Sequence, residues 1–243
     1  MTIPELFNTA LNKPHTDLYE RLEFGKENRI FTTGFYAEGL ITLLSEKNVI
    51  AKIFTNEKIS ANNSNCSIVQ LEGRTIEKIA AFPDNTFNII SFSWPGEWQS
   101  IAPLLEEFRR VTKPGGQTAI LALKDSTPTP VMAILKKTLE KKYQGRAKFC
   151  PPVYPESVKT IRKAFDKAGF VSIRVWEDSF AFDVTEALLK EYSDILLNQL
   201  LPPDDKILKK EDLQNAFLNE LVSNCKDGVL HITYEYLGGI GYK

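Results

Sequence analysis

Cysteine and histidine are scarce in this sequence, and their positions exclude several kinds of site. The three cysteines, Cys66, Cys150 and Cys225, are odd in number, lie far apart and lack the spacing of metal ligands. We therefore expect neither a zinc site nor a disulfide, which fits reduced thiols in a cytoplasmic compartment. The two histidines, His15 and His231, have no partner that spacing identifies, so we interpret both as structural.

An excess of one charge and long apolar segments are also missing. Lysine and arginine total 30 against 31 aspartates and glutamates, and this net charge of -1 would attract neither nucleic acid nor a membrane surface. No apolar run reaches the roughly 18 residues of a membrane-spanning helix, and the N-terminus lacks the basic start and apolar core of a secretion signal. These absences predict a cytoplasmic protein without nucleic-acid or membrane partners.

The residues that are present predict an α/β fold. The chain has 243 residues, 43% of them hydrophobic, which fits one domain with a full core and an added helical cap. Short apolar runs alternate with amphipathic segments, as in a mostly parallel sheet. We expect strands at 29–33, 49–55, 67–71, 87–92 and 118–123. We expect helices at 16–26, 38–46, 185–200 and 211–224, and others that begin at Pro103, Pro130 and Pro155.

The stretch from Ala81 to Lys124 is the most informative. Its apolar run, FNIISF, follows the turn residues PDNT, as in a central strand with both faces covered. The amphipathic segment that follows ends at Pro114, Gly115 and Gly116, directly before a second apolar run. This order of strand, helix, glycine turn and strand predicts a right-handed crossover between parallel strands.

These residues resemble the class I S-adenosylmethionine-dependent methyltransferases, specifically the small-molecule branch. The matching segments are PDNTF at the fourth strand, where Asn88 replaces the usual aspartate, and RVTKPGG before the fifth. PESVKTIRKAFDKAGFVSIRV resembles the last crossover helix and sixth strand of the family, and KDGVLHITYEYLGGIGYK resembles its closing strand. The resemblance extends from residue 66 to residue 243 and is poor in the N-terminal third.

The resemblance implies a doubly wound, seven-stranded sheet in the order 3-2-1-4-5-7-6, with the last strand antiparallel, and a helical cap. It implies a single domain over residues 1–243 that contains a helical lid at 1–27 and a nucleotide-binding half at 28–124. A substrate-side half with helical insertions would follow at 125–243. The implied cofactor is S-adenosylmethionine, and the implied partner is a small-molecule methyl acceptor.

The glycine turn that holds the cofactor in this family is altered here. In RIFTTGFYAEG, Gly34 keeps the first glycine and Gly39 lies one residue late, whereas Tyr36, Glu38 and Thr32 replace two glycines and an acid. A tyrosine held in a glycine conformation costs about 1–3 kcal/mol, and the loss of a charged hydrogen bond costs about 1.5–3 kcal/mol more. Two interpretations stay open. Either the loop bends differently, Gly34 and Gly39 still let the backbone approach the ligand, and Tyr36, a catalytic candidate, or Glu38 contacts the cofactor or the substrate. Or the turn is merely structural and the pocket is closed or changed.

The resemblance also implies cofactor contacts at the ends of the second and third strands. Glu57, with Asn56 beside it, falls nearest the acid that binds the ribose hydroxyls in the family. Glu72 matches the acid that contacts adenine, and Leu71 would pack on the adenine ring. A solvated turn is the alternative interpretation at each position.

The exit of the fourth strand, SFSWPGEW, supplies the remaining candidates because open α/β sheets bind ligands at this edge. Ser91 is a cofactor candidate, and Ser93 and Trp94 lie next to it. Trp94 and Trp98 would form a wall for the substrate, unless both are core residues. Glu97 would be a catalytic base if desolvated, and an exposed residue of a first helical turn otherwise.

Aromatic residues near the C-terminus are further candidates for an acceptor pocket. These are Tyr234, Tyr236 and the segment 180–183, together with the helix from Pro130, although core packing is the commoner role of such residues. Methyl transfer needs alignment in a dry cleft more than it needs a catalytic triad or a metal.

Three hypotheses follow for function. The first is methyl transfer from S-adenosylmethionine to a small molecule. The second, motivated by Thr32 and Tyr36, is a non-catalytic binding or regulatory subunit, either as a homodimer or paired with an active relative. The third is the same fold running a different reaction on a small ligand.

Overall fold

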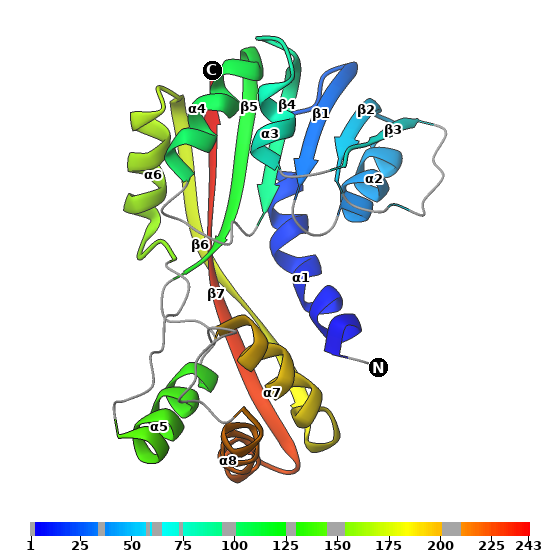
Figure 1. The fold of residues 1–243 in the computed structure, drawn as a ribbon. Helices are drawn as coiled ribbons and strands as arrows, with labels where there is room; N and C mark the ends of the chain where they lie inside the picture. Colours follow the sequence, from blue (N-terminus) through cyan, green and yellow to red (C-terminus); the bar gives the residue numbers. More distant parts are fainter. Residues whose placement is uncertain are drawn as a thin grey trace. The chain divides into compact units, whose positions relative to one another are not determined.

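The computed structural model describes residues 3–33, 37–56, 59, 65–72, 75–93, 101–124, 130–144, 154–200 and 210–243. Its strands form a seven-stranded sheet in the order β3-β2-β1-β4-β5-β7-β6, which confirms the predicted order (Figure 1). Neighbours from β3 to β5 are parallel, and β7 is antiparallel to β5. The strands are β1 (Glu27–Thr33), β2 (Ile50–Thr55), β3 (Cys66–Gln70), β4 (Phe87–Ser93), β5 (Thr112–Leu123), β6 (Val171–Thr185) and β7 (Val229–Tyr242).

Helices alternate with the strands along the first part of the chain and follow β6 in the last part. They are α1 (Ile3–Glu20), α2 (Ala37–Glu46), α3 (Thr75–Ala80), α4 (Ile101–Val111), α5 (Val131–Tyr143), α6 (Val158–Lys167), α7 (Glu186–Leu200) and α8 (Lys210–Ser223).

The chain forms two compact units. The first, called here the sheet unit, consists of Leu11–Asp125, Tyr154–Asp178 and Tyr236–Lys243. The second, called the helical unit, consists of Met1–Ala10, Ser126–Val153 and Ser179–Glu235. All the residues for which the sequence predicts cofactor contacts belong to the sheet unit.

One face of the sheet unit packs against α3, α4 and α6. Phe31, Phe54 and Ile90 are buried on this face together with residues of all three helices. The rings of Phe82 and Phe87 lie 4.9 Å apart in an edge-to-face contact, and Phe87 contacts Phe31 and Phe54 in the same way. Such edge-to-face pairs stabilise a core beyond the burial of their area, by about 0.5–1.5 kcal/mol each.

The opposite face of the sheet unit is covered by the second half of α1. Gln117 of β5 exchanges two hydrogen bonds with the backbone of Glu23, at 3.1 and 2.8 Å. Tyr236 of β7 donates a hydrogen bond from its hydroxyl to Asp17, at 2.9 Å. Arg21 lies over the ring of Trp176 in β6. These contacts show that α1 runs antiparallel to β5, with Asp17 toward the carboxyl end of that strand.

The glycines after α4 lie inside β5 and do not precede it, in contrast to the predicted turn. The pairing of β5 with β4 is irregular between Phe87 and Ile89, so Pro114–Gly116 form a bulge within the strand. A Cβ atom on Gly116 would lie 2.8 Å from the carbonyl oxygen of Asn88. Glycine is therefore required by the close approach of two backbones.

Three other predicted boundaries are wrong. The helix expected from Pro103 begins at Ile101, so the proline lies at its third residue. The helix expected at 16–26 runs from Ile3 to Glu20 and contains Pro14, because burial of Leu11, Leu18 and Tyr19 outweighs the unfavourable effect of the proline. The helix expected from Pro155 begins at Val158. Its N-cap is Ser157 in an extended conformation, and serine is a preferred residue at this position.

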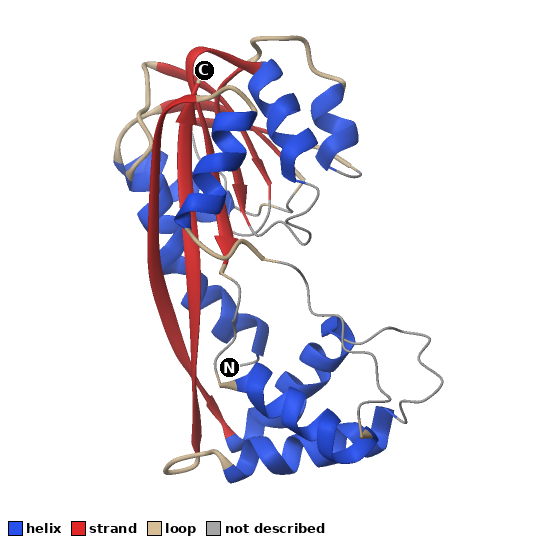
Figure 2. Ribbon diagram, turned by 90° about the vertical axis from the view of Figure 1, so that its left-hand side faces the viewer, coloured by secondary structure: helices blue, strands red, loops and turns tan. Residues whose placement is uncertain are grey.

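The helical unit has its own core. α8 packs against α5 and α7, and the ends of β6 and β7 that belong to this unit lie beside its helices (Figure 2). Phe180 and Phe182 stack on Tyr234, with ring centroids at 5.3 and 5.7 Å. The hydroxyls of Tyr192 and Tyr234 lie 3.3 Å apart. Phe180, Phe182 and Tyr234, which were considered for an acceptor pocket, are thus core residues of this unit, whereas Tyr236 belongs to the sheet unit.

Candidate functional site

A row of buried hydroxyl groups crosses the carboxyl ends of the central strands. Thr32 of β1 is in register with Thr55 of β2 and with Ser91 of β4. Paired residues of neighbouring strands project to the same face, so these three side chains form one row. All three are at most 2% exposed. Gln117 and Tyr236 share the face of Ser91 by register, so the row faces the α1 side of the sheet.

Ser91 differs from its neighbours in its hydrogen bonding. Its side chain is 0% exposed, and its Oγ atom has no hydrogen-bond partner among the residues that the structure describes. A buried hydroxyl without a partner is destabilising by about 1–3 kcal/mol, and such groups in native proteins call for an explanation. A bound ligand that hydrogen-bonds to Ser91 would supply one.

Ser91 and Thr32 also flank the point where the order of the sheet reverses. β1 and β4 are neighbours, but the chain leaves β1 toward β2 and leaves β4 toward β5. Because both crossovers are right-handed, α2 and α4 cover opposite faces, which makes the carboxyl ends of the two strands a topological switch point. Open α/β sheets bind ligands at such a switch point.

A second pair of polar side chains lies at the same edge on the α4 side. Thr33 donates a hydrogen bond from its hydroxyl to Asn56 Oδ1, at 2.9 Å. Thr33 is buried, whereas Asn56 is exposed directly after β2. The amide of Asn56 is thus held in place by β1 and can still donate and accept hydrogen bonds at the end of β2. From the sequence, either Glu57 or Asn56 could accept the ribose hydrogen bonds, but the contact of Asn56 with Thr33 depends on strand register and was not predicted.

The predicted contacts after β3 lie in different environments. The backbone N–H of Leu71 donates to the carbonyl of Thr55, at 2.8 Å, and the Leu71 side chain is half-buried against the aromatic core. Glu72 is exposed at the next position. Gly39 lies in the first turn of α2 and is half-buried. Leu71 and Glu72 lie at the end of β3, whereas Gly39 belongs to the helix that follows β1.

Other predicted residues lie outside the described part of the chain. These include Gly34 and Glu57, which the sequence predicts to contact the cofactor, and Tyr36, which it predicts as a catalytic residue. These remain predictions from the sequence. Trp94, Glu97 and Trp98 also lie outside the described residues, and their roles stay predictions from the sequence.

Asn88, which replaces the usual aspartate, has a structural partner. Its side-chain oxygen accepts a hydrogen bond from the backbone N–H of Arg29, at 2.9 Å. An amide oxygen satisfies this donor as an aspartate would, and the replacement therefore leaves the pairing of β1 with β4 intact.

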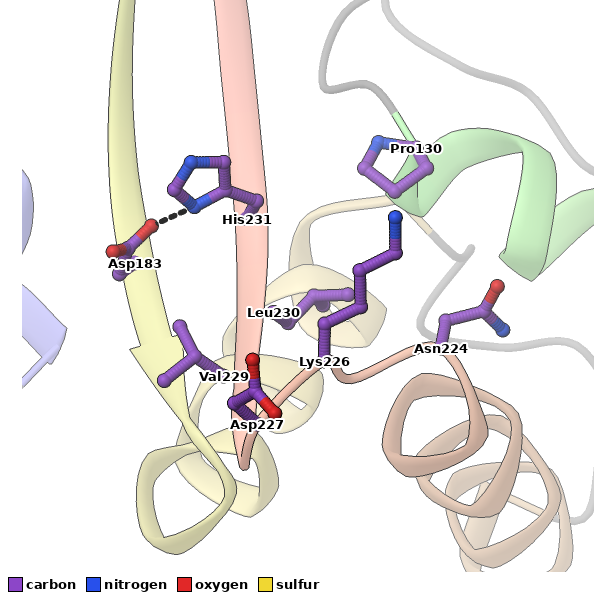
Figure 3. A pocket seen from close by; sticks show the side chains of 8 residues that line it. All are labelled: Pro130, Asp183, Asn224, Lys226, Asp227, Val229, Leu230 and His231. Carbon is purple, nitrogen blue, oxygen red and sulfur yellow. Dashed lines mark ion pairs between the residues drawn. The ribbon is translucent and has the colours of Figure 1, made fainter.

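The helical unit contains a pocket with a volume of about 570 Å³. Pro130 and Leu230 contribute to its apolar lining, and Lys226 and Asp183 belong to its charged lining (Figure 3). His231 forms an ion pair through Nδ1 with Asp183 of the neighbouring strand. Spacing alone identifies no such partner, because the two residues meet only through strand pairing. Both side chains are exposed, and exposed pairs contribute little to stability.

The described residues contain no cluster of histidine, cysteine, aspartate and glutamate that could hold a metal ion. Every helix in the described part of the chain is too short or too polar to span a lipid bilayer.

The hydroxyl row and the Asn56 amide are neutral donors and acceptors, which suit the hydroxyl and amino groups of a nucleoside.

No protein-family model and no curated protein matches this chain. Among solved structures, it is similar to the YcgJ protein of Bacillus subtilis, with 14% identity over 94% of this chain and 98% of that chain, and a TM-score of 0.53. It is also similar to a proposed methyltransferase of Bacillus halodurans, with 14% identity over 94% and 97% of the two chains and a TM-score of 0.51. A third similar structure is a proposed type II methyltransferase of Anaeromyxobacter dehalogenans, with 11% identity over 95% of each chain and a TM-score of 0.55. At these identities the comparisons establish the fold, and the chain has the fold of the class I S-adenosylmethionine-dependent methyltransferases that its sequence resembles.

Proposed function

We propose that this protein transfers a methyl group from S-adenosylmethionine to a small-molecule acceptor. The observation that carries the proposal is the buried Ser91 hydroxyl, which lacks a partner among the described residues and lies at the switch point of the sheet. A polar atom left without a partner in a methyltransferase fold, at the edge where such sheets bind ligands, is explained by a ligand with matching polar groups.

Residues of several strand ends would hold the cofactor. In this proposal Ser91 and Thr32 contact its methionine and ribose portions, and Asn56 or Glu57 binds the ribose hydroxyls. Leu71 and Glu72 contact the adenine. Gly34 and Gly39 allow the backbone to approach the ligand, as glycine does wherever a Cβ atom would collide.

The acceptor would be bound beyond the end of β4. Trp94 and Trp98 form its apolar wall in this proposal, and Glu97 and Tyr36 are the candidates for contact with the reacting group. The cofactor supplies an electrophilic sulfonium, so alignment and exclusion of water provide most of the rate acceleration.

The altered turn predicts weaker cofactor binding than a glycine-rich turn would allow. Thr32 is buried and neutral where the family has an acid, so one charge-assisted hydrogen bond worth about 1.5–3 kcal/mol is missing. We expect this loss to weaken affinity by about one to two orders of magnitude.

A thermal-shift titration with S-adenosylhomocysteine tests the proposal. A ligand that binds only the native state raises the melting temperature, and we expect such a rise for the wild-type chain at millimolar ligand. The variant Tyr36→Gly examines the turn: tighter binding indicates obstruction by the tyrosine, and weaker binding indicates a ligand contact. Absence of a shift in both proteins would contradict the proposed cofactor.

The neutral residue at position 32 also favours a second function, a non-catalytic subunit that binds a partner. In that case Thr32 would replace the acid because the protein no longer binds the cofactor. Detection of methyl transfer to any acceptor would exclude this alternative. A pocket that holds another ligand would instead point to a different reaction on the same fold.

A further inference from the structure

His15 lies on the stripe of α1 that faces the sheet. The buried residues of this helix half include Leu11, His15, Leu18 and Tyr19, with Leu22 just beyond, which is the spacing of one helix face. Residues of a neighbouring stripe contact other strands. Lys13 pairs with Asp178 of β6, and Asp17 accepts a hydrogen bond from Tyr236 of β7. His15 itself is 0% exposed and is therefore not part of the solvent-facing side.

The contacts of α1 also place His15 along the strands. Glu23 is level with Gln117 in the middle of β5, whereas Asp17 is level with Tyr236, which pairs with Leu123 at the end of β5. Because α1 runs antiparallel to β5, His15 lies farther along, at the level beyond Leu123. β4 ends earlier, at Ser93, which pairs with Leu121. His15 is thus at the carboxyl edge of the sheet, on the face to which Ser91 and Ser93 project.

The hydrogen bonding of the ring defines its tautomer. His15 Nδ1 lies 2.8 Å from the carbonyl oxygen of Leu11. A carbonyl oxygen only accepts hydrogen bonds, so Nδ1 carries the proton and donates it. In the neutral ring, Nε2 then carries the lone pair, which makes it the basic nitrogen.

We propose that His15 Nε2 accepts the hydroxyl proton of the methyl acceptor, so that the substrate is a phenol or an alcohol. This inference rests on the proposed methyl transfer. The acceptor oxygen forms a bond to the methyl carbon as the carbon–sulfur bond breaks, and the electron pair of that bond goes to sulfur. The proton of the hydroxyl passes to Nε2, which releases it to solvent after the product departs.

Burial makes His15 suited to hydroxyl acceptors and unsuited to amines. Burial lowers the pKa of His15 to about 4, against 6.5 ordinarily. Alkylammonium groups have a pKa of about 10, so a neutral imidazole of this kind cannot take their proton. A hydroxyl proton becomes strongly acidic as its oxygen is methylated, and a weak base then suffices.

Nitrogen NMR gives a readout that does not depend on activity. The chain has two histidines, so the variant His231→Gln leaves His15 as the source of all imidazole signals. We expect a long-range ¹H–¹⁵N spectrum at pH 7 to show a protonated Nδ1 and an unprotonated Nε2. A protonated Nε2, or an imidazolium, would overturn the proposal.

Methyl transfer from labelled S-adenosylmethionine tests the acceptor class. The probes are a pool of phenols and primary alcohols and a matched pool of anilines and alkylamines. We expect O-methyl products, with turnover reduced about 100-fold or more in both His15→Gln and His15→Phe. The control His231→Gln should keep the wild-type rate. The proposed role of His15 would be overturned by N-methyl or C-methyl products, by an absence of O-methyl products, or by full turnover in both His15 variants.

Binding of S-adenosylhomocysteine separates the two proposals. A wild-type chain that does not bind it contradicts the proposed function. A chain that binds S-adenosylhomocysteine but methylates only amines contradicts the proposed role of His15 and leaves the proposed function intact. The melting temperature of each variant with this ligand shows whether the substituted protein still folds, so a loss of turnover in a folded variant supports the role of His15.

Discussion

Replacement of Ser91 by alanine should stabilise the ligand-free protein and weaken cofactor binding. The Ser91 hydroxyl is buried without a partner among the described residues, which is unfavourable by about 1–3 kcal/mol. The small void left by one oxygen atom offsets part of the gain. We therefore expect Ser91→Ala to raise the free energy of unfolding by about 1 kcal/mol, a shift of roughly 2–4 °C in melting temperature for a chain of this size.

A matched control uses a buried hydroxyl that has a partner. Thr112 donates its hydroxyl proton to the carbonyl of Phe108, at 2.7 Å, so Thr118 is the donor in the 3.1 Å contact between the two threonines. Thr118→Val removes that bond at nearly constant volume. It should lower the free energy of unfolding by about 0.5–1.5 kcal/mol, opposite in sign to the effect of Ser91→Ala.

Urea denaturation of both variants, with and without S-adenosylhomocysteine, measures these effects. The ligand should stabilise the wild-type chain more than Ser91→Ala, by about 0.5–1.5 kcal/mol, because only serine gains a hydrogen bond. If Ser91→Ala is as destabilising as Thr118→Val in the absence of ligand, the serine has a partner and the reasoning fails.

Three further predictions concern packing and titration. Gly116→Ala should lower the free energy of unfolding by about 1–3 kcal/mol in urea denaturation, because its Cβ would lie 2.8 Å from the Asn88 carbonyl oxygen. Tyr236→Phe should lower it by about 1.5–3 kcal/mol at neutral pH. Burial and the hydrogen bond to Asp17 raise the pKa of Tyr236, so wild-type stability should fall above about pH 10 and should fall more steeply than that of the variant. His15 has its pKa lowered to about 4, and the unfolded chain binds this proton first as pH falls below 6.5. Stability should therefore decline between pH 6.5 and pH 4, by up to about 3 kcal/mol, and much less in His15→Phe.

The order of the sheet was implied by the family resemblance, and local signals and chain topology agree with it. Apolar runs such as 87–92 could be recognised from composition, and the crossover rules limit how successive strands are arranged. The PDNTF and KPGG segments carry the family resemblance, and this resemblance implied the order of the strands. Pro130 lies directly before the first residue of α5, as the sequence predicted for a helix-opening proline.

The boundaries that were wrong depend on tertiary packing. A proline inside a helix is destabilising, yet the buried stripe around His15 stabilises α1, which contains Pro14. The bulge at Gly116 is set by the approach of Asn88 from another strand, which no local pattern encodes.

The candidate site was predictable in its location and incomplete in its members. Thr32 and Ser91 follow from their places at strand ends. Thr55 and the Thr33–Asn56 pair required strand register, because their partners are more than 20 residues away in sequence. The role of His15 required both the hydrogen bond within α1 and the placement of the helix on the sheet.

The most direct test of the central claim, that the switch point between β1 and β4 binds a nucleoside cofactor, is calorimetric titration of the full chain with S-adenosylhomocysteine. We predict saturable binding of one ligand per chain. Absence of measurable heat at millimolar ligand, together with an unchanged melting temperature, would contradict the account.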